Sequence, residues 1–407
     1  MTKPGSAIID TDAAAHTVST LHLILLACFA ILSTIGISFG IHALVLGHGE
    51  TFNTTREVPW GLLIASYVFF ASMSTGLCIV ASLGQVFGIR VFQPIVERTI
   101  FLAIVTIAGG LMSISLELEN PWRVPIYGVL SPHPESNIWW KSTIYSIYFV
   151  LLTLDLTMLH LGKRKAAARF GLVALIACLA ANLNMKADMS VIGSREFWLE
   201  NYMPLYFAIQ ATLLGCSATM FFNWAAIKLD KQPIDAGMQD ALSMIAKISV
   251  ILLILTAGFV GWKIYSGLFN MTENQDAMML LLKGSYAGNF WIGEVILAVL
   301  APLALITAAR TKNVTDLAAA GLVCLVGTFV MIYDLVVVGQ LIPVFHQYNI
   351  VDLPRYFSYT PSLHEDMIFI GAISFVITAF LIWEHFYKIR AMEAASLTQG
   401  TNAGVGD

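Results

Sequence analysis

The sequence predicts an all-α membrane protein with about ten transmembrane helices. Of its 407 residues, 57% are hydrophobic and only 12% are charged, whereas about a quarter of the residues in soluble domains are charged. About ten apolar runs reach the roughly 20 residues that a helix needs to cross a bilayer. The Lys and Arg residues also divide unevenly between the connections of these runs, as expected for a chain that crosses a membrane repeatedly.

The apolar runs define the predicted helices in chain order. They are Thr20–Leu46, Trp60–Phe87, Thr99–Leu118, Ile138–Leu161, Phe170–Lys186, Tyr202–Ile227, Ile245–Tyr265, Leu281–Ala308, Thr315–Leu341 and Met367–Tyr387. We expect a single membrane domain over residues 1–407. Within it, helices 2–5 (residues 59–187) and helices 6–9 (residues 201–341) are predicted to form two four-helix bundles, with helices 1 and 10 flanking them.

Basic residues indicate the orientation. When the connections are assigned alternately to the two sides, 14 of the 22 Lys and Arg residues fall on one side. Cytoplasmic connections are the ones enriched in Lys and Arg. We therefore expect both termini in the cytoplasm and the chain in the cytoplasmic (inner) membrane of a bacterium or an archaeon.

The predicted outer connections are longer than the inner ones and carry Pro, Trp, Tyr and His. They are Glu119–Asn137, Ala187–Asn201, Ser266–Leu280 and Ile342–Asp366. Loops of this length without low-complexity sequence are usually functional or bound to a partner. The alternative is that they only cover the ends of the bundle.

Helices 2 and 6 share a pattern that indicates an internal repeat. Tyr67–Gly76 and Tyr206–Gly215 each consist of Tyr, eight residues and Gly, at an offset of 139. The same offset places Asp155 of helix 4 on Glu294 of helix 8. Each half would then contain an even number of helices, so the halves would share one orientation and be related by an axis along the membrane normal.

Helix 4 carries a polar stripe. Lys141, Tyr145, Tyr148, Leu152 and Asp155 follow one another at steps of four and three residues, so they lie on one face of the helix. We expect that face to point into the bundle, with the carboxylate near the middle of the membrane. Ionisable residues inside a membrane are costly and usually functional. The alternative is a structural hydrogen-bond partner.

Three carboxylates are candidates for a proton relay: Asp155, Glu294 on helix 8, and Asp334 near the outer end of helix 9. Burial disfavours the charged form of a carboxylate, which suits it to exchange protons. Lys247 and Lys263, at opposite ends of helix 7, are expected to extend to the membrane surface.

Other recognisable chemistry is not predicted. The cysteines stand alone in apolar runs, without the paired spacings of metal or iron–sulfur ligands. The histidines near predicted spans, His42, His160, His346, His364 and His385, fall at helix ends or in loops, whereas a membrane haem needs facing histidines within the bundle. We expect no metal, haem or iron–sulfur cluster in this chain, and its small net charge of −4 does not suggest a nucleic-acid partner.

Four segments resemble one family. Glu117-Leu-Glu-Asn-Pro-Trp-Arg123, at the outer end of helix 3, resembles the Asp-Leu-Gly-Arg-Pro-type segment of the NrfD/PsrC family, the membrane subunits of polysulfide reductase-like complexes. Trp60-Gly-Leu-Leu-Ile-Ala, Asn289–Pro302 and Gly327–Gln340 are also similar to segments of that family. The predicted ten helices are more similar to the HybB, DsrP and QrcD-type members than to the eight-helix polysulfide reductase subunit.

The resemblance implies a quinone-binding membrane anchor of a respiratory oxidoreductase rather than the catalytic centre itself. Such a subunit exchanges electrons between the menaquinone or ubiquinone pool and an iron–sulfur, ferredoxin-like subunit on the periplasmic side, with further catalytic or cytochrome subunits. Glu119 and Asn120 replace the Gly-Arg of the family segment, and Ile332 stands where the ninth helix often has Arg. The family's mechanism of proton movement therefore cannot be assigned to this chain on the resemblance alone.

Quinone reduction takes two electrons and two protons, so its site needs hydrogen-bond donors and a titratable path to water. Our candidate residues at the outer depth are Tyr67, Glu117, Trp122, Arg123, Tyr145 and Tyr148. The alternative function is a secondary transporter built from two repeats, with Asp155 and Glu294 as ion sites. Such transporters usually have paired helices interrupted at mid-membrane, and Pro302 is the only proline deep in a predicted helix.

Overall fold

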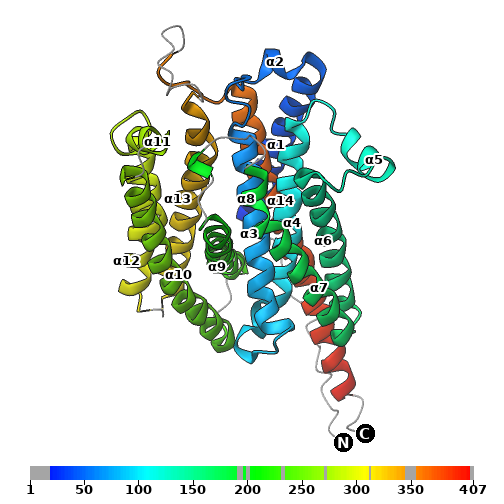
Figure 1. Cartoon of the computed structure of the whole chain (residues 1–407). Helices are drawn as coiled ribbons and strands as arrows, with labels where there is room; N and C mark the ends of the chain where they lie inside the picture. The colour runs from blue at the N-terminus through cyan, green and yellow to red at the C-terminus, as the bar shows by residue number, and fades with distance from the viewer. Residues whose placement is uncertain are drawn as a thin grey trace, which may run out of the picture.

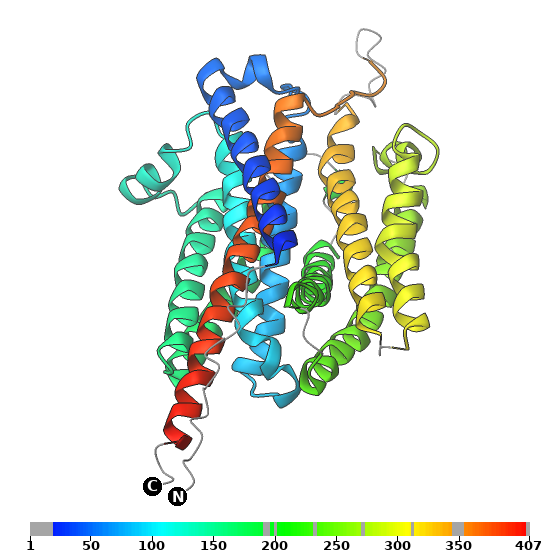
Figure 2. The same ribbon diagram turned by 180° about the vertical axis from the view of Figure 1, so that it is seen from behind.

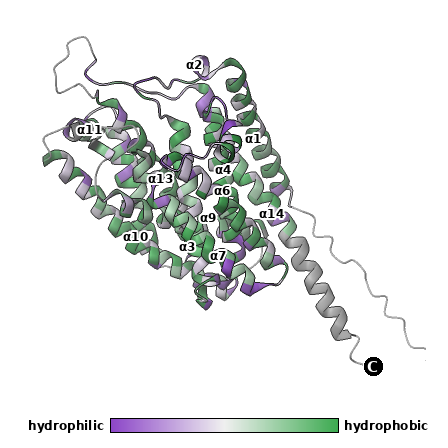
Figure 3. Ribbon diagram, turned by 45° about the vertical axis from the view of Figure 1, so that its right-hand side comes forward, coloured by the Kyte–Doolittle hydropathy of each residue, from purple (hydrophilic) through white to green (hydrophobic). Residues whose placement is uncertain are grey.

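Ten helices of the computed structural model are long and apolar enough to cross a membrane, counted over the residues that the structure describes. Those residues are 19–189, 196–198, 202–230, 234–269, 273–310, 313–343 and 354–403. Every described element is helical (Figure 1). The predicted all-α fold class and the ten spans are therefore confirmed, and hydrophobic residues predominate along the helices (Figure 3).

The first part of the chain contains four spans besides α1. Its elements are α1 (Thr20–Leu46), α2 (His48–Thr51), α3 (Leu62–Gln85), the 3-10 helix η1 (Arg90–Ile95), α4 (Val96–Glu117), α5 (Arg123–Leu130), α6 (Asn137–His160), α7 (Arg164–Leu183) and α8 (Met185–Met189). α2 and α5 lie at the same end of the bundle, at the top of Figure 1. We call this the outer end, following the predicted orientation.

The second part contains the other five spans. Its elements are η2 (Glu196–Trp198), α9 (Met203–Asp230), α10 (Ala236–Phe269), α11 (Glu273–Leu282), the π-helix η3 (Asn289–Leu300), α12 (Ala301–Ala308), α13 (Val314–Leu341) and α14 (Leu363–Ala403). η3 and α12 are continuous and form one span. Parts of the second, third and fourth predicted outer loops lie outside the described residues.

The start of the eighth span differs from the prediction. Leu281 and Leu282 belong to α11, and the chain turns at Gly284, whose N–H donates to the carbonyls of Met279 and Leu280 at 3.0 and 3.1 Å. The span then begins at Asn289 rather than at Leu281. The apolar run therefore covers two elements, because its leucines belong to a short outer helix.

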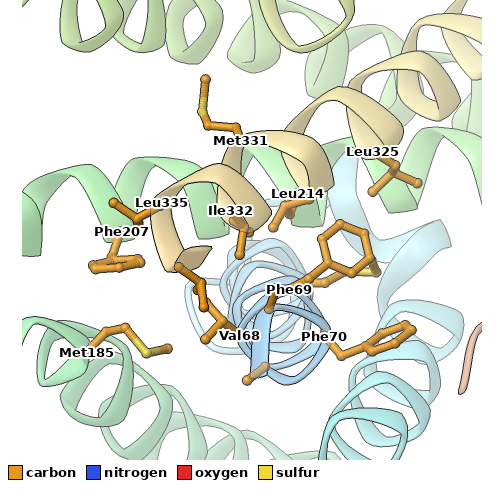
Figure 4. Close-up of a cluster of buried hydrophobic side chains, with 14 of the residues drawn as sticks. Val68, Phe69, Phe70, Met185, Phe207, Leu214, Leu325, Met331, Ile332 and Leu335 are labelled. Carbon is orange, nitrogen blue, oxygen red and sulfur yellow. The ribbon is translucent and has the colours of Figure 1, made fainter. Parts of the chain in front are cut away.

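α3 is the most enclosed of the described spans: 89% of an 18-residue apolar stretch of this helix is buried. It packs on α4, α7, α9 and α13. Figure 4 shows Val68, Phe69 and Phe70 of α3 among side chains from α9 and α13, including Leu214 and Ile332. The hydrophobic core therefore lies where the two parts of the chain meet.

Two glycines make this meeting possible. A Cβ atom added to Gly76 of α3 would lie 1.7 Å from the Ala211 carbonyl oxygen, and one added to Gly215 of α9 would lie 2.1 Å from the Gly76 carbonyl carbon. Small residues allow membrane helices to approach this closely. The two glycines of the predicted repeat therefore face each other across the α3–α9 contact.

The contacts between helices define two groups. α3, α4, α6 and α7 pack on one another, and so do α9, α10, the η3–α12 span and α13. α1 and α14 pair on one side, with α14 also against α4 (Figures 1 and 2). The description as two repeated bundles, over residues 59–187 and 201–341, stays a prediction.

A buried ion pair fixes α14 near the inner end. The Arg98 guanidinium of α4 donates to both oxygens of Glu384 at 2.6 and 3.0 Å, and to Asn223 Oδ1 of α9 at 2.8 Å. Glu384 is 1% exposed. Arg98, one of the basic residues assigned to the cytoplasmic side, therefore joins three helices.

Candidate functional site

The polar stripe of α6 is its buried face. Its buried residues are Lys141, Tyr145, Tyr148, Leu152, Asp155 and Leu156. This confirms the face that the spacing predicted. The stripe places an ammonium, two phenols and a carboxylate inside the bundle, in order from the outer to the inner end.

Three predicted tyrosines come together at the α3–α6 contact. The Tyr67 and Tyr145 rings meet edge to face at 6.3 Å, and the Tyr145 and Tyr148 rings are 6.3 Å apart. The Tyr148 hydroxyl donates to the Ser74 carbonyl at 3.0 Å and lies 2.9 Å from the Ser74 hydroxyl. Tyr148 is therefore held in place by α3, whereas Tyr67 is only partly buried.

Lys141 lies one turn outward of Tyr145. It is 4% exposed, and its Nζ is 2.8 Å from the Met185 sulfur. Together with the phenols it forms a group of N–H and O–H donors over about two turns in the outer half of α6 and on the facing part of α3. We call Lys141, Tyr67, Tyr145 and Tyr148 the donor group.

Asp155 is buried near the inner end of α6. It accepts a hydrogen bond from Gln85, the last residue of α3, and is 1% exposed. It lies in the last two turns of α6, because the helix ends at His160 and the chain reverses at Gly162, which has a φ of 70°. The predicted burial of Asp155 is therefore confirmed, and its depth in the membrane stays a prediction.

Glu117 lies at the other end of the first part, as the last residue of α4. It is half-buried and close enough to Glu365 of α14 for the two carboxyls to interact electrostatically. One turn inward, the Ser113 and Ser66 hydroxyls are 3.0 Å apart and join α4 to α3. Glu117 is thus placed just outward of Tyr67.

Trp122 and Arg123 do not join the donor group. Both are exposed, Trp122 by 55%, and no residue of α5 is buried. α5 projects from the side of the bundle in Figure 1. The chain leaves α4 through a turn in which the Arg123 N–H donates to the Asn120 carbonyl at 3.0 Å, and this turn directs both side chains outward.

A second charged group lies in the other part of the chain. The Lys263 ammonium of α10 donates to both oxygens of Glu294 at 2.9 and 3.0 Å, and Glu294 is fully buried. Lys263 also lies 5.5 Å from the centre of the Phe290 ring. The expectation that Lys263 extends to the membrane surface was wrong, because a buried carboxylate at its own depth binds it.

Asp334 of α13 completes this group. Its Oδ1 accepts a hydrogen bond from Asn289 Nδ2 at 2.9 Å, and its Oδ2 is buried without a hydrogen bond from the described residues. Its carboxyl interacts with that of Glu294. We call Lys263, Glu294 and Asp334 the buried cluster.

A cavity of about 20 Å³ adjoins the buried cluster. This is room for about one water molecule. Its polar lining comes from Lys263, Glu294, Ser266, Tyr202 and Tyr206, and apolar side chains such as Phe197 and Phe259 line the rest.

The backbone around Glu294 is a π-helix. η3 runs from Asn289 to Leu300, and its packing against α13 is very close: a Cβ atom on Gly327 would lie 2.1 Å from the Ala298 nitrogen. π-helical turns are rare and are often found at functional sites. The wider turn was not predicted, since no residue pattern distinguishes it from an α-helix.

Asp155 and Glu294 do not occupy corresponding depths. Glu294 lies in the second turn of its span, near the outer end, whereas Asp155 lies near the inner end of α6. Both spans run from the outer to the inner end. The offset of 139 matches the glycines of α3 and α9 but fails here, because Asn289, the first residue of η3, lies 152 positions after Asn137, the first residue of α6.

Sequence reasoning missed several partners. Gln85, Asn289 and Glu365 are polar residues near helix ends, and no sequence pattern connects them with their partners Asp155, Asp334 and Tyr359. Lys263 could have been identified from the sequence as the partner of Glu294, because a carboxylate buried in a membrane needs a counter-charge and few lysines lie within spans. Among the described residues, no group of three or more His, Cys, Asp and Glu side chains could hold a metal ion.

Comparison with known proteins gives the family. The family model described as polysulphide reductase, NrfD matches residues 50–344. The chain is 24% identical to a selenate reductase subunit of Mesobacillus selenatarsenatis, over 87% of this chain and 92% of that protein. It is 23% identical to the Hdr-like menaquinol oxidoreductase integral membrane subunit of Archaeoglobus fulgidus, over 88% and 92%. Because the model matches more than half of the chain, this protein belongs to the NrfD family.

Proposed function

We propose that this NrfD-family protein is the quinone-reactive membrane anchor of a multisubunit oxidoreductase. The observation that carries the proposal is the family match over residues 50–344, which includes the donor group and the buried cluster. The names of the two relatives, a reductase subunit and a menaquinol oxidoreductase subunit, support the same class of complex. Menaquinone is therefore our proposed substrate.

The donor group fits a quinone headgroup. A quinone carries two carbonyl oxygens on a flat apolar ring, and it needs donors to those oxygens within an apolar slot. Tyr67 and Tyr145 present phenols from two facing helices, and the Lys141 ammonium lies one turn outward. These residues would hold and orient the ring, while Tyr148, fixed by Ser74, would keep α6 in register with α3.

Two carboxyl positions would handle protons in this proposal. Glu117, just outward of the donor group, would receive protons from a quinol or supply them to a quinone. Asp155, hydrogen-bonded to Gln85 near the inner end, would exchange protons with the cytoplasmic side. The quinone supplies the two-electron chemistry, and this chain supplies donors, orientation and proton acceptors.

The electrons require a partner, which we propose to be an iron–sulfur subunit on the periplasmic side. The described part of this chain offers no group of metal ligands. α5 and the ends of α10 and α11 lie at the outer end (Figure 1), and the donor group lies in the outer halves of α3 and α6. A partner bound there would be separated from the quinone by the outermost turns of the spans only.

Purification in mild detergent tests this proposal. The account expects a complex in which the chain copurifies with a subunit that contains iron and acid-labile sulfide, and in which added menaquinol reduces those clusters. A chain that is recovered alone and stable, and that carries a solute across vesicle membranes without reacting with quinol, would contradict it and support a secondary transporter.

A further inference from the structure

α5 is an apolar helix whose side chains the described part of the chain leaves exposed. It runs from Arg123 to Leu130 with the sequence Arg-Val-Pro-Ile-Tyr-Gly-Val-Leu, and none of its residues is buried. Its large apolar side chains are between 42% and 79% exposed, and they are Val124, Ile126, Tyr127, Val129 and Leu130. A concentration of exposed apolar side chains of this kind marks a surface that contacts a protein partner or a membrane.

The apolar side chains surround α5 instead of forming one face. With about 3.6 residues per turn, Val124, Ile126 and Val129 point in three different directions around the helix axis. Arg123 is the only charged residue of α5. A helix that docks on a protein has one apolar face and one polar face, whereas a helix that is apolar on all sides has apolar surroundings on all sides. The distribution therefore favours lipid over a protein partner.

The position of α5 relative to the spans also favours lipid. α5 projects sideways from the bundle and lies lower than α2 in both Figure 1 and Figure 2. α2 follows the outer end of the span α1, whose last two turns expose the apolar side chains of Ile41, Val45 and Leu46. α5 therefore lies beside the apolar outer turns of the spans and not beyond them.

Two tryptophans at the start of α6 bind the α5 segment through its backbone. The Trp139 indole N–H donates to the Gly128 carbonyl at 2.9 Å, and the Trp140 indole N–H donates to the Pro134 carbonyl at 2.8 Å. Gly128 lies in the last turn of α5, whose carbonyls find no partner within the helix. Backbone groups in lipid must be paired by the protein itself. The two indoles supply bonds that water would supply to an exposed loop.

The exposed apolar surface of α5 continues into the exposed face of the span α6. Residues of α6 at steps of seven, three and four are 37% to 55% exposed, and they are Trp140, Ile147, Val150 and Leu154. These steps place them on one face of the helix, which faces lipid in a span. Trp140 lies at the outer end of this face, and Trp122 and Tyr127 are also exposed. Trp and Tyr are enriched where a membrane meets water.

We propose that α5 inserts into the leaflet at the outer end of the bundle and binds phospholipid through apolar contacts. The proposal does not depend on the proposed function, and it leaves the rest of the outer end to the iron–sulfur partner. Because Trp139 and Trp140 join α5 to the first turn of α6, the lipid contact also fixes the outer end of that span, where Lys141 of the donor group lies. With Arg123 as its only charge, α5 should bind lipid independently of salt.

Fluorescence quenching tests the proposal on the full chain with its copurifying subunits in phosphatidylcholine vesicles. Cys28→Ala removes the exposed cysteine, and the other four cysteines are buried. A small thiol-reactive fluorophore is then attached at Val129→Cys on α5. Ile41→Cys, at an exposed position in the outer part of α1, is the lipid control, and Glu50→Cys on α2 is the water control. The quenchers are a phosphatidylcholine with a nitroxide near its headgroup, and iodide on both sides of the membrane.

We expect the nitroxide lipid to remove as much fluorescence from the Val129 label as from the Ile41 label, and iodide to quench the Glu50 label alone. High salt should leave the lipid quenching unchanged. Quenching of the Val129 label by iodide to the extent seen at Glu50 would place α5 in water and overturn the proposal. Protection of that label from both quenchers would show that a protein subunit covers α5, and this result would overturn the proposal as well.

Discussion

At the scale of single residues, burial of polar groups was predictable and their partners were not. The 4-3-4-3 spacing on α6 identified Lys141, Tyr145 and Asp155 as inward-facing, and they are buried. The same pattern could not show that Gln85 binds Asp155 or that Lys263 binds Glu294, because these contacts join residues 70 and 31 positions apart. A single sequence does not show which distant residues pair. It shows only that a buried charge needs a partner of opposite charge.

The Lys263–Glu294 pair leads to a stability prediction. Lys263→Met removes the counter-charge of a fully buried carboxylate, so we expect a loss of about 3–5 kcal/mol of stability. Combining it with Glu294→Gln should restore most of that loss. Thermal unfolding in detergent measures both, and Lys283→Met, at an exposed site, is the control. A single variant as stable as the control would show that the pair is not buried as described.

The relay carboxylates lead to a prediction about turnover. Asp155→Asn and Glu294→Gln keep shape and hydrogen bonding but cannot ionise. We expect Asp155→Asn to assemble normally and Glu294→Gln to be less stable, because the Lys263 ammonium loses its counter-charge. Per assembled complex, quinol turnover should decrease by about a hundredfold in at least one variant, or become uncoupled from proton uptake. Steady-state assays with a pH indicator measure both quantities. If turnover and proton stoichiometry are unchanged in both variants, the two carboxylates are structural.

At the scale of elements, apolar length predicted the spans, and local interruptions changed their ends. Ten runs became ten spans, but the run that starts at Leu281 divides at Gly284, so the eighth span begins at Asn289. The π-helix at Glu294 and the outward projection of α5 both depend on tertiary packing. Trp122 and Arg123 are exposed for that reason, although their sequence context suggested a shared site.

The α3–α9 contact can be tested at its glycines. Gly76→Ala would place a methyl group 1.7 Å from the Ala211 carbonyl oxygen, so the helices must separate. We expect a loss of about 1–3 kcal/mol. Gly261→Ala on α10, where no atom lies within 4 Å, should be neutral or slightly stabilising. Unfolding of the two variants under identical conditions decides the matter, and equal stabilities would contradict the close approach.

At the scale of the whole molecule, composition predicted the class and the resemblance predicted the family, which the match over residues 50–344 shows. The orientation stays a prediction. Reporter fusions at Lys165 and Ser131 should report the cytoplasmic and the outer side, respectively, as the distribution of basic residues indicates. A cytoplasmic signal at Ser131 would place the donor group on the wrong side for a periplasmic iron–sulfur partner.

Photolabelling with an azido-menaquinone tests the central claim, a quinone site at the donor group, most directly. Irradiation of the full chain with its copurifying subunits, followed by peptide mapping, should label the outer halves of α3 and α6 around Tyr67 and Tyr145. Excess menaquinone should suppress this labelling, and Tyr145→Phe should weaken it. Labelling that excess menaquinone does not suppress, or that is confined to the inner end near Asp155, would contradict the account.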